Sequence, residues 1–315
     1  MKASQALALD LLFLFVNHFQ KALNIRTDIF GEKDMNTSRS QIGLATVFGE
    51  KGMFVQSRDL YEKALDTRKE ILGSEHPSLA SIYDYLGLIA QYQNDLDIAQ
   101  YYHENALKIT LQSAGESSSK TGQMYNNLGN CHFKKKDFDT ALKYYGYAQR
   151  VFENLLNPND PILAECLNNF GSCYFENGDL KEALNYFKQA LEISDNSSDS
   201  LPEKGAIYRT NIGQIHALNS DWESALVYYE GAIELLKNGS NHSLQLPSVL
   251  TAIGELFLKQ NENPNQEDLK SALNEFSKAL DILNQHWAQF QDPESIQILL
   301  DNNYQVFEFL IETHF

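Results

Sequence analysis

A repeat of 42 residues runs through most of this chain and constrains its fold more than any other feature. Alanines recur at this spacing, with one longer last interval of 47 residues: Ala22, Ala64, Ala106, Ala148, Ala190, Ala232 and Ala279. Three positions before each stands an aromatic residue or a histidine: Phe19, Tyr61, His103, Tyr145, Phe187, Tyr229 and Phe276. A further register holds small residues: Ala45, Gly87, Gly129, Gly171, Gly213 and Gly254. Registers that stay in phase over such a length indicate a repeat protein.

The repeat over residues 162–203 shows what one unit contains. In its first half, apolar residues are spaced by three or four positions: Leu163, Leu167, Phe170 and Tyr174. Its second half keeps the same period, which is typical of helices and not of strands. The turn sequence ENGDL separates the halves. Gly171 lies inside the first helix, where glycine costs about 1 kcal/mol relative to alanine. We therefore expect this glycine to allow close packing of a neighbouring helix.

One helix pair cannot bury its apolar face alone, so the pattern predicts an all-α solenoid of stacked helix–turn–helix repeats. We expect a single solenoid over residues 1–315. Its predicted parts are a partial repeat at 1–35, repeats at about 36–77, 78–119, 120–161, 162–203, 204–246 and 247–292, and a C-terminal helix at 293–315.

Two stretches carry a family resemblance: NNLGNCHFKKKDFDTALKYYGYA and NNFGSCYFENGDLKEALNYFKQAL resemble tetratricopeptide (TPR) repeats. The usual repeat of that family has 34 residues. The 42-residue spacing, with RKEILGSEHPSLA after a second helix, resembles the repeats of kinesin light chains and the bacterial arrays that precede caspase-like peptidases. The resemblance implies a right-handed superhelix whose first helices line a concave, partner-binding groove.

Composition limits the partners and the compartment. The formal net charge is −17, which disfavours nucleic acids and anionic membranes as partners. The sequence contains no run of 18 apolar residues, so no membrane span is expected. Three cysteines, Cys131, Cys166 and Cys173, form no disulfide framework. We expect them to be buried, and we expect a cytoplasmic protein.

No catalytic, nucleotide-binding or metal-binding motif is present in the sequence. We therefore expect that the chain is not an enzyme and that it binds no cofactor or metal. The histidines are scattered, and His103 takes the aromatic position of its repeat. We expect it to be a packing residue.

The best candidate site is a set of amide side chains on the expected first helices. Amides donate and accept hydrogen bonds together, so they can hold the backbone of an extended peptide. Asn127, Asn169 and Asn211 are spaced by 42 residues. The full predicted peptide-binding set is Asn126, Asn127, Asn130, Asn168, Asn169, Asn211, Gln214, Phe133 and Phe175. Bracing of the neighbouring repeat is an equally weighted alternative for any single asparagine.

The two ends are unusually apolar for the caps of a solenoid. LLFLFV stands near the N-terminus, and Tyr304, Phe307, Leu310 and Ile311 follow a helical spacing near the C-terminus. We interpret the N-terminal run as a helix and not as a signal peptide. The first functional hypothesis is a non-catalytic scaffold that binds a protein or peptide. The alternatives are a regulatory array of a larger enzyme, such as a caspase-like peptidase, and a homo-oligomeric module joined through its apolar ends.

Overall fold

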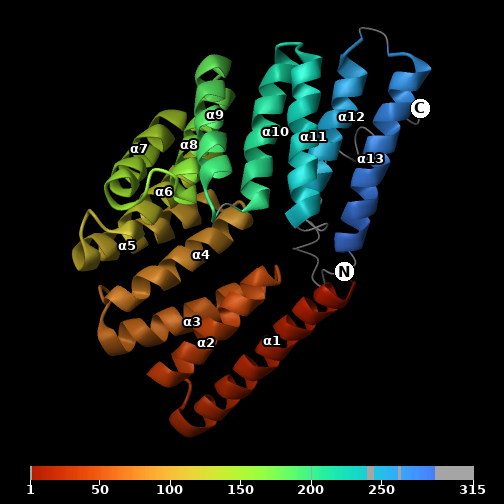
Figure 1. The fold of residues 1–315 in the computed structure, drawn as a ribbon. Helices are drawn as coiled ribbons and strands as arrows, with labels where there is room; N and C mark the ends of the chain where they lie inside the picture. Colours follow the sequence, from red (N-terminus) through yellow and green to blue (C-terminus); the bar gives the residue numbers. More distant parts are fainter. Residues whose placement is uncertain (1, 200, 240–244, 262–263, 288–315) are drawn as a thin grey trace. The chain divides into compact units, whose positions relative to one another are not determined.

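The structure, a computed structural model, describes all residues except 1, 200, 240–244, 262–263 and 288–315 (Figure 1). Every regular element in the described ranges is helical. This confirms the predicted all-α class. The apolar C-terminal positions named above, from Tyr304 onward, lie outside the described residues.

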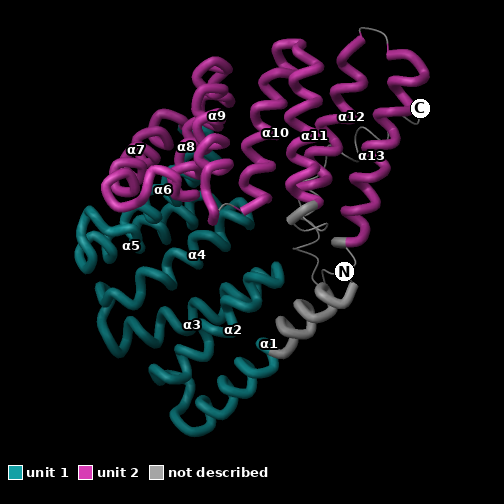
Figure 2. Tube along the Cα trace, viewed as in Figure 1, with its two compact units in different colours: residues 1–137, 292–295 teal, residues 138–291, 296–315 magenta. Residues whose placement is uncertain are grey.

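The chain divides into two compact units (Figure 2). The first unit extends to Asp137 and the second begins at Phe138. The elements of the first unit are α1 (Lys2–Phe30), α2 (Met35–Glu50), α3 (Phe54–Leu72), the 3₁₀ helix η1 (Pro77–Leu79), α4 (Ala80–Tyr92), α5 (Leu96–Ala114) and α6 (Ser119–Lys134). Those of the second unit are α7 (Phe138–Leu155), α8 (Pro161–Glu176), α9 (Leu180–Asn196), α10 (Pro202–Leu218), α11 (Trp222–Gly239), α12 (Leu246–Lys259) and α13 (Gln266–Trp287).

Helices pack most closely as consecutive pairs, which are α2 with α3, α4 with α5, α8 with α9, α10 with α11 and α12 with α13. This confirms the predicted helix–turn–helix unit. We call the even-numbered helices first helices and the odd-numbered ones second helices. Whether the repeats form one continuous solenoid over residues 1–315 stays a prediction.

In four of the helix pairs, the glycine of the first helix lies against the ring at the aromatic position of the following second helix. A Cβ atom added to Gly171 would stand 2.6 Å from the Phe187 ring, and one added to Gly213 would stand 2.6 Å from the Tyr229 ring. A Cβ atom added to Gly87 would likewise stand 2.6 Å from the His103 ring. The expected close approach at these glycines is confirmed. The aromatic side chains reach nearly complete burial at these contacts.

The turns inside the pairs share one backbone geometry. A residue with positive φ recurs every 42 residues: Gly52, Asn94, Lys136, Gly178 and Ser220. In the α8–α9 turn, Asp179 N donates to Tyr174 O at 2.9 Å and Gly178 N donates to Phe175 O at 3.0 Å. This is a Schellman-type ending, which satisfies the last carbonyls of the first helix. It lets the chain reverse within a few residues.

The longer connections begin the next first helix with caps. Pro161, Pro202 and Pro247 stand at the first positions of α8, α10 and α12, where a missing N–H breaks no helical bond. The Asp160 side chain accepts a hydrogen bond from Ile162 N at 2.9 Å. The three cysteines are buried, as expected. No helix among the described residues has the length and apolarity to cross a membrane.

Candidate partner-binding face

Two of the three asparagines at the 42-residue spacing, Asn127 and Asn211, join neighbouring first helices. Asn127 of α6 is only 6% exposed, and its Nδ2 donates to Asp84 Oδ1 of α4 at 2.7 Å. In the second unit, Asn211 Nδ2 of α10 donates to Asn168 Oδ1 of α8 at 2.8 Å. Both bonds span 43 residues. The structure thus gives these two amides a bracing contact at the same register. Peptide binding by either residue stays a prediction.

Asp84 is the centre of a buried polar cluster in the first unit. Its Oδ1 lies 3.1 Å from Nδ1 of His103, which is fully buried over Gly87. Gln91 Nε2 donates to the Asn127 backbone carbonyl at 3.1 Å. Lys134 Nζ in turn donates to the Gln91 backbone carbonyl at 3.0 Å. The cluster ties α4, α5 and α6 together, and His103 is a packing residue as expected.

The other predicted site residues differ in exposure. Asn126 is buried, Asn130 and Phe133 are half-buried on the same helix, and Asn169 is half-buried on α8. Phe175 is half-buried against the cluster that contains Phe187 and Ile212. Gln214 on α10 is exposed. The predicted set therefore divides into residues that form the floor between helices and residues that solvent or a partner can reach.

Two exposed aromatic residues of α4 were not among the predicted site residues. Tyr85 occupies the register of Asn127 one repeat earlier, is exposed, and stacks on Tyr61 with ring centroids 5.3 Å apart. Tyr92 is 58% exposed and stacks on Phe54 at 5.2 Å. The amide pattern that defined the candidate set does not include tyrosine. An accessible aromatic side chain at the register position was the signal that could have found Tyr85.

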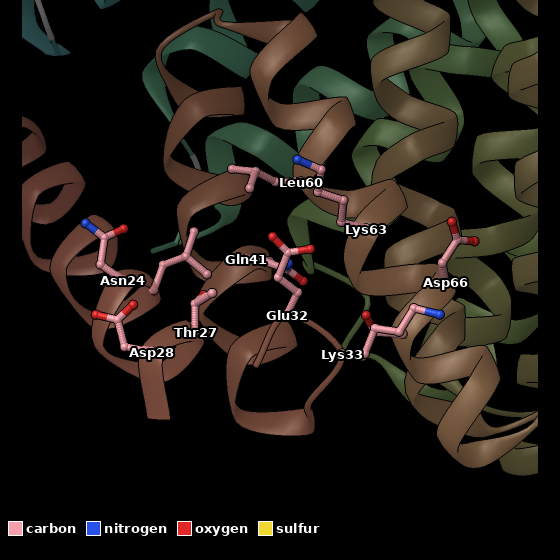
Figure 3. Close-up of a pocket in the computed structure, with 11 residues that line it drawn as sticks. Asn24, Thr27, Asp28, Glu32, Lys33, Gln41, Leu60, Lys63 and Asp66 are labelled. Atoms are coloured by element: carbon pink, nitrogen blue, oxygen red, sulfur yellow. The ribbon is translucent and has the colours of Figure 1, made fainter. Parts of the chain in front are cut away.

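A pocket of about 420 Å³ lies within the first unit, between the second helices α1 and α3. Figure 3 shows Asn24, Thr27 and Asp28 on one wall, Leu60, Lys63 and Asp66 on the other, and Gln41 of α2 between them. A second pocket of about 470 Å³ lies between α11 and α13 and has a floor of Ile253 and Phe257. Both pockets have the size of small-molecule sites.

The thiols lie in surroundings that oppose ionisation. Burial raises the pKa of Cys166 and of Cys173 to about 12, with the nearby Glu165 contributing at Cys166. Burial also raises the pKa of Cys131. Thiols in such surroundings are poor nucleophiles at neutral pH. In the described ranges, no group of three or more His, Cys, Asp or Glu side chains is arranged to hold a metal ion.

Solved structures share this fold over long stretches. BtubC (BKLC) from P. vanneervenii superposes with a TM-score of 0.61 at 23% identity, over 73% of this chain and 93% of that one. A Rap protein complexed with Competence and Sporulation Factor gives 0.64 at 15% identity, over 96% and 87%. The apo form of RapI gives 0.62 at 14% identity, over 88% and 97%. At these identities the likeness shows the fold alone.

A comparison with curated proteins found no significant match. The sequence model of the tetratricopeptide repeat matches residues 16–70, 50–112 and 120–196. These matches cover more than half of the chain and include both helix pairs of the first unit and the α8–α9 pair of the second. The chain belongs to the tetratricopeptide repeat family.

Proposed function

We propose that the chain is a non-catalytic interaction scaffold that binds a peptide or protein partner along its first helices. The supporting observation is the combination of fixed helix spacing with accessible side chains. The bonds from Asn127 to Asp84 and from Asn211 to Asn168 hold neighbouring first helices at one register. Beside them, Tyr85 and Gln214 are exposed. Within each unit, a rigid helix face that carries an exposed aromatic or amide group can bind an extended backbone with a low ordering cost.

A structurally similar Rap protein supports this proposal, because it was solved as a complex with Competence and Sporulation Factor. The net charge of −17 favours partners that are neutral or basic. We place the scaffold in the cytoplasm, since cysteines without a disulfide framework suit a reducing compartment.

A peptide-display selection against the purified chain tests this proposal. Affinities of the selected peptides would then be measured by calorimetry for the wild type and for Gln214→Ala and Phe175→Leu. Each substitution should weaken binding by roughly fivefold or more if its side chain contacts the peptide. Val227→Ala is the matched control, since Val227 is an exposed residue of the second helix α11.

Two results would contradict the proposal in different ways. If no peptide is selected, the chain is no peptide-binding scaffold. If selected peptides bind both variants as tightly as the wild type, the chain is a scaffold whose contact surface lies away from α8 and α10.

A further inference from the structure

The pocket between α1 and α3 contains a buried polar group that the protein itself does not satisfy. Gln41 is only 6% exposed, and its Oε1 has no hydrogen-bond partner among the described residues. Figure 3 places its side chain between the two walls of the pocket. A buried carbonyl oxygen without a donor is uncommon in native proteins. The position therefore favours a ligand that donates hydrogen bonds.

The other repeats place different residues at the register of Gln41: Tyr83, Tyr125, Leu167, Arg209 and Leu250. In the next repeat, Tyr83 packs against Tyr102 of α5, with ring centroids 6.1 Å apart. The ammonium group of Lys69 lies over the Tyr83 ring at 5.1 Å from its centroid. The protein thus places its own cation between α3 and α5.

The same positions in the first repeat carry shorter side chains. Thr27 stands 42 residues before Lys69, and Leu60 stands 42 residues before Tyr102. A threonine cannot extend across the space that a lysine side chain covers. The pocket is consequently open where the following repeat holds a lysine and two tyrosines.

The charges around the pocket also favour a cation. Its lining includes three carboxylates, Asp28, Glu32 and Asp66, and two amines, Lys33 and Lys63. Lys33 Nζ bonds Glu70, which is not part of the lining, at 2.6 Å. These carboxylates are not arranged as a metal-binding group. A spread of acceptors suits a planar group with several donors better than a metal ion.

We propose that this pocket binds a guanidinium group on an aliphatic stem. The guanidinium would donate to Gln41 Oε1 and to the wall carboxylates, since it carries five N–H donors in one plane. Leu23 and Leu60 line the same pocket and would cover the stem. The guanidinium can belong to a free small molecule or to an arginine side chain of a partner. The inference does not depend on the proposed first-helix surface, because none of that surface's residues lines the pocket.

The test is a titration of the ¹⁵N-labelled full chain, followed through the side-chain amide of Gln41. The probes are agmatine, the blocked tripeptide acetyl-Gly-Arg-Gly-amide, and the same tripeptide with citrulline in place of arginine. A guanidinium probe should shift the Gln41 signal to saturation, and the uncharged citrulline peptide should not. Tighter binding of the tripeptide than of agmatine would identify a partner side chain as the source, and the reverse would identify a small molecule.

Two variants separate binding from folding. Their binding is measured by calorimetry, because neither keeps the Gln41 side-chain amide. The triple substitution Thr27→Lys, Gln41→Tyr and Leu60→Tyr reproduces the filled arrangement of the next repeat and should abolish binding while the chain stays folded. Gln41→Leu uses the residue found at positions 167 and 250, removes the acceptor, and should weaken binding by about tenfold or more. The proposal is overturned if neither guanidinium probe shifts Gln41, if citrulline binds equally well, or if the filled variant still binds.

Discussion

At the scale of single residues, the glycine register of the first helices gives the sharpest prediction. In Gly171→Ala, the new Cβ would lie 2.6 Å from the Phe187 ring. Overpacking of this kind costs about 1–3 kcal/mol and outweighs the roughly 1 kcal/mol gained in helix propensity. We expect a net destabilisation of up to about 2 kcal/mol, measured by chemical denaturation followed by circular dichroism.

Gly146→Ala is the matched control for that variant. Gly146 lies inside α7 of the same unit, and a Cβ atom there would meet nothing within 4 Å. The propensity gain should then appear alone, as a stabilisation of about 0.5–1 kcal/mol. Equal effects at the two positions would show that the glycine at 171 does not set the spacing of α8 and α9.

The cysteines give a second prediction at this scale. With a pKa of about 12 at Cys166 and Cys173, roughly one thiol in ten thousand is ionised at pH 8, against about one in four for a free cysteine. We expect the native chain to react with a thiol reagent at least about a hundredfold more slowly than the unfolded chain. The reaction would be followed by absorbance with and without denaturant. A fast-reacting thiol in the native chain would mean that the helices around it open readily.

Residue identity predicts some of these features and not others. The Gly–aromatic contacts were predictable because one residue type recurs at each position, as at Gly171 and Gly213. The positive-φ register of the turns was not, because Asn94, Lys136 and Ser220 share a backbone conformation without sharing a side chain. The backbone reversal there is set by the Schellman hydrogen bonds, which leave little mark on the sequence.

At the scale of elements, the asparagine hydrogen bonds between neighbouring first helices are expected to contribute unequally to the stability of the chain. Asn127 donates to a carboxylate and is buried, whereas Asn211 donates to a neutral amide and is half-buried. Bonds to charged groups contribute about 1.5–3 kcal/mol and neutral ones about 0.5–1.5 kcal/mol. Asn127→Ala should therefore destabilise the chain by about 2 kcal/mol and Asn211→Ala by about 1 kcal/mol, as measured by chemical denaturation.

A double-mutant cycle with Asp84→Ala isolates the brace between α4 and α6. Asn154→Ala is the control, because among the described residues Asn154 Nδ2 donates only to Arg150 O within its own helix. That substitution should change the stability by less than about 0.5 kcal/mol. The absence of coupling between Asn127 and Asp84 would argue that the two helices are held by apolar packing and by the remaining Gln91 and Lys134 hydrogen bonds.

The sequence predicts that these asparagines share one helix face. It does not distinguish a hydrogen bond to the neighbouring first helix from a contact with a partner. The 42-residue spacing of Asn127, Asn169 and Asn211 fits both roles. The choice depends on the neighbouring first helix, where Asp84 and Asn168 supply acceptors one position out of that register. A similar limit applies to the pocket beside Gln41. Its opening results from three short side chains on three helices, and no single position reveals it.

At the scale of the whole molecule, the net charge opposes self-association of the chain, whereas exposed apolar surface favours it. The net charge of −17 keeps copies of the chain apart at low ionic strength. On α1, Phe15, Ile25 and Ile29 fall on one side by their spacing and are each half or more exposed. Exposed apolar side chains that gather on one side of a helix can contribute to an interaction site.

We therefore expect the purified chain to self-associate through α1 as its concentration rises. Light scattering should give a mass above the 35.8 kDa of one chain, and added salt should strengthen the association by screening the negative charge. The double substitution Ile25→Gln with Ile29→Gln keeps the charge and the helix propensity and should return the mass toward one chain. Val227→Gln removes an equally exposed apolar residue from α11 and should leave the association intact. A mass that stays at one chain at every concentration and salt would mean that the exposed side of α1 has another partner or none.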